Sequence, residues 1–459
     1  MREYREEDQI LKKVKHIHMI GIGGSGMCPI AEILNHKGYI ITGSDNNESD
    51  PLKRVRKFAK VWLGHDASHV EGAELVIYSA AIFKDNVELQ AAREKGIPTM
   101  ERSHALGALT RMYDNVIGVS GTHGKTTVTS LITQILIQNN CSPSAVIGGK
   151  LPLVDHYGVI GDSQTMVVES CEFVDTFLQL SEDIAVLLNI DNDHLDYFKT
   201  MDNMIRSFHQ FVSKASTVFV NGDDQRSMIA VKDIPGKIIT FGLDSKNDYY
   251  AAQLNTGKYG YRFNVYYHDE LIGEVEMGIP GRHNVYNGLV SFAVCHYLGL
   301  DPQEISKSII QFKGAGRRFE FIGDYGFMLA DDYGHHPTEI EATLKAAKEL
   351  DYQRVVAVFQ PFTYSRTAML LDDFARVLQI ADEVVLTPIM GSREVNTYNI
   401  YSEDLLALLP NAKLFNTFEE IRDYIIKTAK KGDLVITMGC GDIYKVAHML
   451  TDYYEKAAQ

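Results

Sequence analysis

Residues 116–127 read Val-Ile-Gly-Val-Ser-Gly-Thr-His-Gly-Lys-Thr-Thr and predict a phosphate-binding loop. An apolar, β-branched run leads into the glycines, and a helical run over 128–138 follows them. A strand, a tight turn and a helix N-terminus together offer backbone N–H groups and a favourable dipole to an anion. We expect Lys125 to reach the β- and γ-phosphates of a nucleotide and the Thr126 hydroxyl to ligate Mg²⁺. The pattern G-x-x-x-x-G-K-[ST] is incomplete, because Val119 stands where its first glycine belongs.

Composition limits the classes of protein that this chain can belong to. A length of 459 residues predicts two to four domains. The net charge of −15 argues against a nucleic-acid partner, which would need a basic face. No apolar stretch is long enough to span a membrane, and the charged N-terminus lacks an apolar leader, so we expect a cytoplasmic protein. The five cysteines are scattered and include no C-x-x-C pair, so their spacing indicates neither a disulfide framework nor a zinc site.

A second glycine-rich loop lies near the N-terminus. Gly21, Gly23 and Gly26 satisfy G-x-G-x-x-G after an apolar run, and Asp45 follows a second predicted strand at the distance of the dinucleotide fingerprint. The pattern only requires a pyrophosphate and a ribose, so it fits NAD and a UDP-sugar equally. Ser79 follows a third predicted strand, 75–78. Alternating strands and helices here predict a doubly wound parallel sheet.

Polar side chains follow two strands of the second predicted domain. Glu169 ends the strand predicted at 165–168, and His194 lies just past the one predicted at 184–190. Ligands of open α/β sheets bind at this edge, so both residues are candidates for metal ligation beside Thr126. Gly148 and Gly149 are interpreted as a turn, and 249–275 as antiparallel hairpins. Asn284, at the start of the helix predicted over 285–298, is a cap or an adenine contact.

The last 140 residues return to alternating strands and helices. We predict three α/β domains: an N-terminal Rossmann-like doubly wound sheet over 1–113, a central P-loop-type ATPase domain over 114–314, and a C-terminal Rossmann-like domain over 315–459. Polar groups again follow the predicted strands of the third domain. The adjacent His335 and His336 lack the cysteines or the helical i, i+4 spacing of a zinc site.

Several of these motifs occur together in one known order. The chain resembles the Mur ligase family of ATP-dependent amide-forming enzymes, and the resemblance covers all three predicted domains. The motifs are G-I-G-G-S-G-M (21–27), G-T-H-G-K-T (121–126), P-G-R-H-N-V-Y-N (280–287), R-R-F-E (317–320), D-D-Y-G-H-H-P-T-E-I (331–340) and F-Q-P-x-x-Y-S-R-T (359–367). The resemblance implies that the first domain binds a UDP-sugar, the middle domain ATP and the last domain an incoming amino acid.

The resemblance also implies a reaction. L-alanine is joined to the lactyl carboxylate of UDP-N-acetylmuramate through an acyl phosphate, with ATP and two Mg²⁺ ions, in a monomer or homodimer. The implied catalytic residues are Lys125, His194, Arg318, His335 and Arg366; the metal ligands are Thr126, Glu169 and His194. The implied ATP-binding residues are Gly121, Thr122, His123, Gly124, Lys125, Thr126, Thr127, Asn284, Arg318 and Asp332. The implied UDP-sugar-binding residues are Gly21, Gly23, Gly24, Ser25, Gly26, Asp45 and Ser79. The implied amino-acid-binding residues are Tyr333, His335 and Arg366.

The chain departs from the family pattern at three places. The usual acidic run E-A-D-E-S-D reads E-S-C-E-F-V-D over 169–175, so the metal role passes to Glu169 alone. N-x-E-P-D-H becomes N-I-D-N-D-H, which keeps His194. Phe362 replaces a histidine and Thr363 stands where many members have arginine, which leaves Arg366 to carry the role of that motif.

Three alternatives remain open at this point. A recycling ligase of the same family, which takes a tripeptide in place of alanine, shares the motif around His335, although the stretch 364–367 favours alanine. A dehydrogenase would use the first glycine loop for NAD but leaves the second loop unexplained. A non-catalytic sensor would bind the UDP-sugar without turning over ATP.

Overall fold

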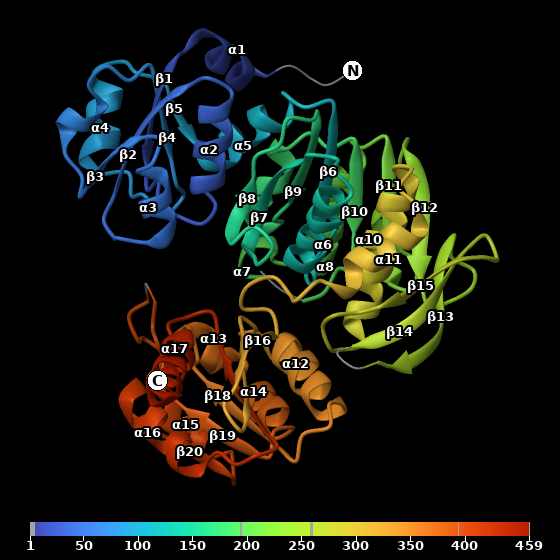
Figure 1. The fold of residues 1–459 in the computed structure, drawn as a ribbon. Helices are drawn as coiled ribbons and strands as arrows, with labels where there is room; N and C mark the ends of the chain where they lie inside the picture. The colour runs from blue at the N-terminus through green and yellow to red at the C-terminus, as the bar shows by residue number, and fades with distance from the viewer. Residues whose placement is uncertain (1–4, 193–194, 258–259, 393, 459) are drawn as a thin grey trace. The chain divides into compact units, whose positions relative to one another are not determined.

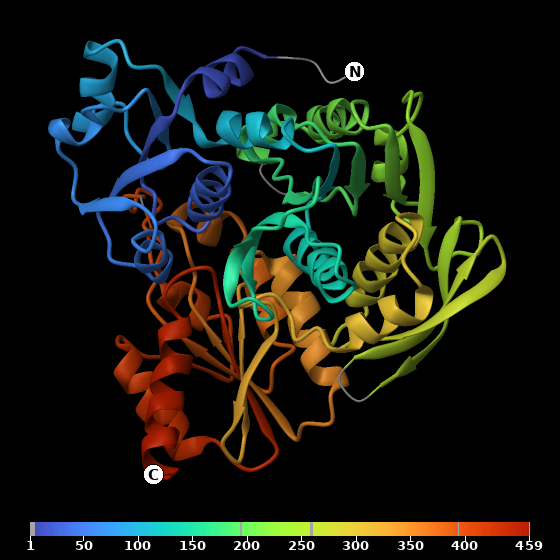
Figure 2. The ribbon, with the colours of Figure 1, turned by 45° about the horizontal axis from the view of Figure 1, so that its top comes forward.

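The computed structural model describes residues 5–192, 195–257, 260–392 and 394–458. Three sheets organise the chain, and they follow one another along the colour ramp of Figures 1 and 2. Two compact units divide it: Met1–Gln253, Asn264–Val275 and Tyr286–Ile309 form one, and Leu254–Phe263, Glu276–Val285 and Ile310–Gln459 the other. Within the described residues, no helix is both long enough and apolar enough to cross a membrane.

The first sheet has five parallel strands in the order β3-β2-β1-β4-β5. Successive residues of each inner strand point to opposite faces, so Ile17 and Met19 pack into one apolar core and Ile20 into another. Strand order reverses at β1, which places the first glycine loop at the switch point. The elements are α1 (Glu6–Lys13), β1 (His16–Ile20), α2 (Cys28–His36), β2 (Ile40–Asp45), α3 (Asp50–Val55), β3 (Lys60–Leu63), a 3₁₀ turn (Ala67–Val70), β4 (Leu75–Tyr78), α4 (Val87–Glu94), β5 (Thr99–Glu101) and α5 (Arg102–Thr110).

The second sheet has ten strands in the order β15-β14-β13-β12-β11-β10-β6-β9-β7-β8. Its centre is parallel, and order reverses at β6, so the second glycine loop also lies at a switch point. The strands are β6 (Asn115–Ser120), β7 (Ser144–Leu151), β8 (His156–Val159), β9 (Thr165–Glu169), β10 (Ile184–Leu187), β11 (Thr217–Asn221), β12 (Lys237–Gly242), β13 (Tyr249–Thr256), β14 (Tyr261–Tyr267) and β15 (Glu270–Glu276); the helices are α6 (Lys125–Gln138), a 3₁₀ segment (Phe173–Gln179), α7 (Leu195–Phe198), α8 (Met201–Val212), α9 (Gln225–Ala230), α10 (His283–Tyr297) and α11 (Pro302–Ile310).

The third sheet has six strands in the order β16-β17-β21-β18-β19-β20; the edge strand β16 is antiparallel to β17, and the other described pairs are parallel. Val355, Ala357 and Phe359 face one core, and Val356 and Val358 face the other. The elements are β16 (Glu320–Asp324), β17 (Met328–Asp332), α12 (Pro337–Glu349), β18 (Arg354–Phe359), α13 (Tyr364–Met369), α14 (Leu371–Leu378), β19 (Glu383–Leu386), α15 (Ser402–Leu406), β20 (Ala412–Leu414), α16 (Phe418–Thr428), β21 (Asp433–Met438) and α17 (Tyr444–Ala458).

The predicted fold class is confirmed, and one local prediction is wrong. Gly148 and Gly149 do not form a turn, because they lie inside β7, which pairs in parallel with β9 and antiparallel with β8. A Cβ at Gly148 would lie 2.5 Å from an oxygen of Glu169, so glycine is needed here to make room for that carboxylate. The glycine therefore marks a close approach inside a strand.

Candidate active site

The second glycine loop joins β6 to α6 with two residues in the left-handed backbone region. Gly121 has φ +137° and Gly124, which precedes the helix, has φ +91°. A Cβ at Gly124 would also lie 2.7 Å from the Asn287 side-chain oxygen. The helix begins at Lys125, so the N–H groups of its first turn lack partners within the helix and suit an anion.

The Lys125 ammonium folds back over its own loop. Nζ donates to the carbonyl oxygens of Gly121 (2.6 Å) and Thr122 (3.0 Å), and lies 2.9 Å from an oxygen of Glu172. The Glu172 side chain is only 1% exposed. Burial disfavours the charge on Lys125, but the carboxylate of Glu172 outweighs it and raises the lysine pKa. The lysine is therefore a fixed cation at the mouth of the loop. Glu172 belongs to the run at 169–175, whose metal role the sequence assigned to Glu169 alone.

Two of the predicted metal ligands meet. The Thr126 hydroxyl donates to Glu169 across 3.0 Å, and the second oxygen of Glu169 accepts from the Gly148 N–H (2.8 Å). Adjacent ligands of an octahedral Mg²⁺ ion, with bonds of about 2.0–2.1 Å, lie about 2.9 Å apart. The hydroxyl and carboxylate oxygens thus fit Mg²⁺ in type and in spacing. The third predicted ligand, His194, lies outside the described residues.

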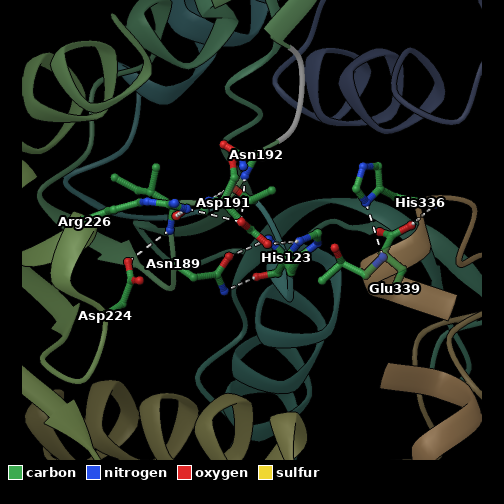
Figure 3. Close-up of polar contacts among 12 residues, drawn as sticks. His123, Asn189, Asp191, Asn192, Asp224, Arg226, His336 and Glu339 are labelled. Atoms are coloured by element: carbon green, nitrogen blue, oxygen red, sulfur yellow. Dashed lines mark hydrogen bonds and ion pairs between the residues drawn. The ribbon is translucent and has the colours of Figure 1, made fainter. Parts of the chain in front are cut away.

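A network of polar side chains supports the loop from the next strand (Figure 3). Asn189 accepts from the His123 N–H at 2.8 Å and donates to the His123 carbonyl at 3.0 Å. The His123 ring lies 3.6 Å from Asp191, which also contacts Arg226 at 3.2 Å. The hydrogen bond from His123 lowers the pKa of Asp191, which is therefore ionised. Asn189 and Arg226 hold this loop, and the sequence reasoning missed both; the signal for Asn189 was its place just past β10.

The first glycine loop is closed by its acidic residue. The Gly23 N–H donates to the Asp45 carboxylate at 2.9 Å, and Gly21 donates to the Ser44 carbonyl at 2.8 Å. The Ser79 N–H bonds the carbonyl of Ile20, the last residue of β1, at 3.2 Å. The loop, Asp45 and Ser79 therefore converge at one edge of the first sheet.

A cavity of about 330 Å³ in the first unit lies between the first glycine loop and the strands β7 and β9. Gly24, Ser25, Gly26 and Ser79 line one side of it, and Gly148, Glu169 and Cys171 line the other. Arg102, the first residue of α5, also lines this cavity. Sequence reasoning missed Arg102, although its place immediately after a parallel strand was the same signal that identified Ser79.

The second unit gathers another group of predicted residues. The Arg318 guanidinium lies 4.9 Å from the centre of the Tyr333 ring and 3.8 Å from Glu339. Asp332 accepts from the backbone N–H groups of Phe319 (2.8 Å) and Gly334 (2.6 Å), and burial raises its pKa to about 6. The predicted residues Arg318, Asp332 and Tyr333 therefore form one cluster.

His335 joins this cluster as a cation. Its ring lies 3.3 Å from Glu339, and the rings of Tyr333 and Phe362 approach it edge-on. Burial opposes protonation, but hydrogen bonds to Cys440 and Glu339 raise the pKa of His335 to about 9. A ring that holds its proton at neutral pH is poorly suited to take one from an amine. The raised pKa therefore favours a role for His335 as a hydrogen-bond donor over a role as the base.

The remaining predicted residues are placed as follows. Arg366 lies on α13, partly buried. Asn284 lies in the first turn of α10 and donates to the Pro280 carbonyl at 2.5 Å. Asn287, one turn later, is the residue that contacts Gly124, and sequence reasoning missed it. Thr127 is buried in α6.

Comparisons with known proteins cover the whole architecture. Residues 16–114 match the Mur ligase family, catalytic domain; residues 119–295 match the Mur ligase middle domain; residues 317–441 match the Mur ligase, glutamate ligase domain. UDP-N-acetylmuramate–L-alanine ligase of Caldanaerobacter subterraneus subsp. tengcongensis is 42% identical over 456 residues, covering 97% of this chain and 99% of the relative.

Solved structures agree. UDP-N-acetylmuramate-alanine ligase MurC of Thermotoga maritima superposes with a TM-score of 0.83 at 26% identity, covering 96% of this chain and 99% of that one. A murein peptide ligase of Psychrobacter arcticus has a TM-score of 0.72 at 23% identity, covering 96% and 98%, which supports the fold alone. Three consecutive domain matches and a relative of this identity along nearly the full length settle the family: this chain belongs to the Mur ligases.

Proposed function

We propose that this chain joins L-alanine to the lactyl carboxylate of UDP-N-acetylmuramate, with ATP converted to ADP and phosphate. Its relatives of about 40% identity carry the name of that ligase along nearly their whole length. A dehydrogenase is excluded by the family, and the first glycine loop is assigned to the UDP-sugar.

The observation that carries the proposal is the cavity between the first glycine loop and the hydrogen-bond partner of the second loop. It runs from the Gly24–Gly26 segment to Glu169, which bonds Thr126 of the nucleotide loop. A pyrophosphate on the first loop would therefore direct the sugar of its ligand toward the place where Lys125 and Thr126 hold the γ-phosphate. A carboxylate on that sugar has a short path to phosphorus, which phosphoryl transfer requires.

The reaction follows from this arrangement in two steps. The lactyl carboxylate oxygen attacks the γ-phosphorus, the bond to the β-phosphate oxygen breaks, and ADP leaves. The alanine amine then attacks the carbonyl carbon of the acyl phosphate, phosphate leaves, and the nitrogen loses a proton. Lys125 offsets charge on the transferring phosphoryl oxygens, and the N–H groups at the start of α6 hold the β-phosphate. A magnesium ion on Thr126 and Glu169 would neutralise phosphate charge; we propose a second ion near His194.

We assign the amino acid to the cluster of the second unit. The His335 cation and the Arg366 guanidinium are suited to the alanine carboxylate, since charged donors bind carboxylates most strongly. Arg318 and Asp332 are assigned to the nucleotide side, and Tyr333 to the acceptor. Phe362, which takes the place of a family histidine, packs on the His335 ring, so it supports this residue sterically without replacing the lost polar group.

Phosphate release tests the proposal. The purified chain is incubated with ATP, Mg²⁺ and UDP-N-acetylmuramate, and alanine, glycine, serine or a murein tripeptide is added in separate reactions. We expect release that depends on both the UDP-sugar and alanine. Release with the tripeptide alone would move the assignment to the recycling ligase, and binding of the UDP-sugar without any release would indicate a sensor.

Location and assembly are part of the same proposal. All five cysteines are free of disulfides, which suits the reducing cytoplasm that we propose. We propose a monomer or a homodimer, and light scattering of the purified chain distinguishes the two.

A further inference from the structure

Three ligand-type side chains converge behind the first glycine loop, away from the reacting groups. Cys28 begins α2, Glu32 lies one turn later on the same helix, and His156 comes from β8 of the second sheet. Their ligand atoms all lie within 4.8 Å of one another. All three residues are buried, with exposures of 0%, 5% and 3%.

We propose that Cys28, Glu32 and His156 bind a thiophilic divalent cation, with Zn²⁺ as the best fit. One soft sulfur, one imidazole nitrogen and one carboxylate oxygen form a donor set that zinc accepts and that hard cations such as Mg²⁺ do not. The neighbouring sequence motifs do not predict this site, because the third ligand follows the first by 128 residues.

The distances between the donors support a tetrahedral ion. Zinc bonds of about 2.3 Å to sulfur and 2.0–2.1 Å to nitrogen place those two atoms about 3.6 Å apart. The Cys28 sulfur lies 3.7 Å from Nε2 of His156. The same nitrogen lies 2.6 Å from Glu32, so the carboxylate must move away by about 0.8 Å to reach the tetrahedral edge of about 3.4 Å. The Pro51 carbonyl oxygen, 3.7 Å from the sulfur, or a water molecule completes the ligand set.

Charge at the cluster is arranged for a cation. The Glu32 carboxylate accepts from Arg54 at 2.5 Å and lies 2.6 Å from Nε2 of His156. Arg54 holds only Oε1 of Glu32, at 2.5 Å, which leaves Oε2 to ligate. Outer partners of this kind orient metal ligands.

The thiol is the group that a metal would change. The Cys28 thiol is buried, and its sulfur lies 3.7 Å from Nε2 of His156. A coordinated divalent ion deprotonates a thiol outright, and the helix N-terminus at Cys28 favours the thiolate. Binding therefore releases a proton, and affinity rises with pH.

The positions of the three ligands indicate what a bound ion would do. Cys28 and Glu32 belong to the first sheet's layer, and β8 packs on the same turn of helix, since a Cβ at Gly158 would lie 2.6 Å from Pro29. A bound ion would link α2 to the β7–β8 hairpin. Cys28 follows Gly26 by two residues, so the link would also fix the first glycine loop from behind.

Cobalt provides the test, because a thiolate bound to Co²⁺ gives a charge-transfer band that oxygen and nitrogen ligands do not. The full-length chain is stripped with a chelator, kept free of nucleotide and titrated with Co²⁺, and Zn²⁺ is then added. We expect about one Co²⁺ per chain with the band, its displacement by Zn²⁺, and release of a proton in weak buffer. A chain that gives no band at one equivalent of Co²⁺ overturns the proposal.

Variants locate the ion. Arg54→Met removes an outer partner and should weaken Co²⁺ binding by about 10- to 100-fold. Cys28→Ser and His156→Gln each remove a ligand, so they should abolish the band or weaken Co²⁺ binding by more than that. Cys171→Ser is the matched control, because Cys171 lines the cavity beside Glu169 and could give a thiolate band of its own. A band that disappears in Cys171→Ser and persists in Cys28→Ser places the ion at the nucleotide loop and overturns the proposal.

Folding of the variants is checked independently. Each variant is melted by circular dichroism with and without Zn²⁺, and we expect the cation to raise the melting temperature of the wild-type chain but not of Cys28→Ser. If a variant does not fold, elemental analysis of the folded wild-type chain still decides: zinc well below one equivalent after exposure to excess Zn²⁺ and gel filtration contradicts the site.

Discussion

Replacement of Lys125 by methionine tests the central electrostatic claim. The ammonium lies at the start of α6, where the γ-phosphate is assigned, and it is the cation of the loop. Loss of one such preorganised contact costs about 2.7–4 kcal/mol of transition-state stabilisation, or roughly 10²- to 10³-fold in turnover. We therefore expect the variant to lose nearly all phosphate release at saturating substrates.

The same substitution affects stability, and the structure shows why. Glu172 is 1% exposed and loses its cation when Lys125 is removed. Breaking a buried ion pair by deleting one partner costs about 3–5 kcal/mol, because the remaining charge is stranded. The lysine side chain is itself 13% exposed, so we expect a value near the lower end, which lowers the melting temperature by several degrees.

A double variant separates the two effects. Lys125→Met combined with Glu172→Gln leaves no stranded charge, so the melting temperature should recover most of the loss. Turnover should stay low, because the cation is still absent. The assays are coupled phosphate release and thermal melting of the four proteins of the cycle. Retention of more than about a tenth of the wild-type rate in the single variant, or recovery of turnover in the double variant, would refute the reasoning.

Four further outcomes are expected. Burial raises the pKa of Glu182 to about 8, so between roughly pH 4.5 and 8 the folded state holds a proton that the unfolded state has released. The free energy of unfolding should therefore fall by about 1.4 kcal/mol per pH unit in this range. Glu182→Gln should remove that part of the fall when urea unfolding is compared at pH 5.5 and 7.5, and an equal fall in both proteins would contradict the prediction. His335→Gln should raise the KM for alanine by about 10- to 100-fold, the worth of a charged hydrogen bond, and abolish any fall of wild-type kcat/KM near pH 9; an unchanged KM would exclude the role. Asp45→Ala should raise the KM for the UDP-sugar by about 5- to 30-fold and leave that for ATP unchanged, since only the first loop loses a bond. Glu169→Gln should increase the Mg²⁺ concentration needed for half-maximal rate at fixed ATP, and an identical Mg²⁺ curve would count against its role as a ligand.

Local patterns account for most of the fold that could be predicted. The apolar run at 75–78 is β4 with the same bounds, because a short β-branched run between turn residues has few other solutions. Convergence was also predictable in part. Thr126 and Glu169 were paired from the rule that ligands meet at the carboxyl edge of parallel strands, and their oxygens lie 3.0 Å apart.

Features that depend on tertiary contacts could not be predicted. Gly148 looks like a turn residue in the sequence, but the side chain of Glu169 occupies the space of its Cβ. Arg102 stands directly after β5, and Asn287 lies in the motif at 280–287, but the sequence does not show which groups either side chain faces. Cys28 and His156 belong to different sheets, so no spacing rule for metal ligands relates them.

The charges around the second glycine loop would favour binding of a nucleotide together with a divalent ion. Glu172 already neutralises Lys125, and Glu169 contributes a further negative charge a short distance away. A bare triphosphate would therefore add its charge to a loop that is, in sum, anionic, and would have to compete with a buried carboxylate for the lysine. A divalent ion held by Thr126 and Glu169 would reverse that balance, because it would supply positive charge next to the phosphates. The departure at 169–175, where fewer acidic residues remain than in the usual family pattern, lowers the repulsion and leaves the two carboxylates that contact Thr126 and Lys125. The chain thus keeps the two carboxylates that touch the reacting loop, and Asp175 of the same run bonds Tyr197 and Ser207 instead.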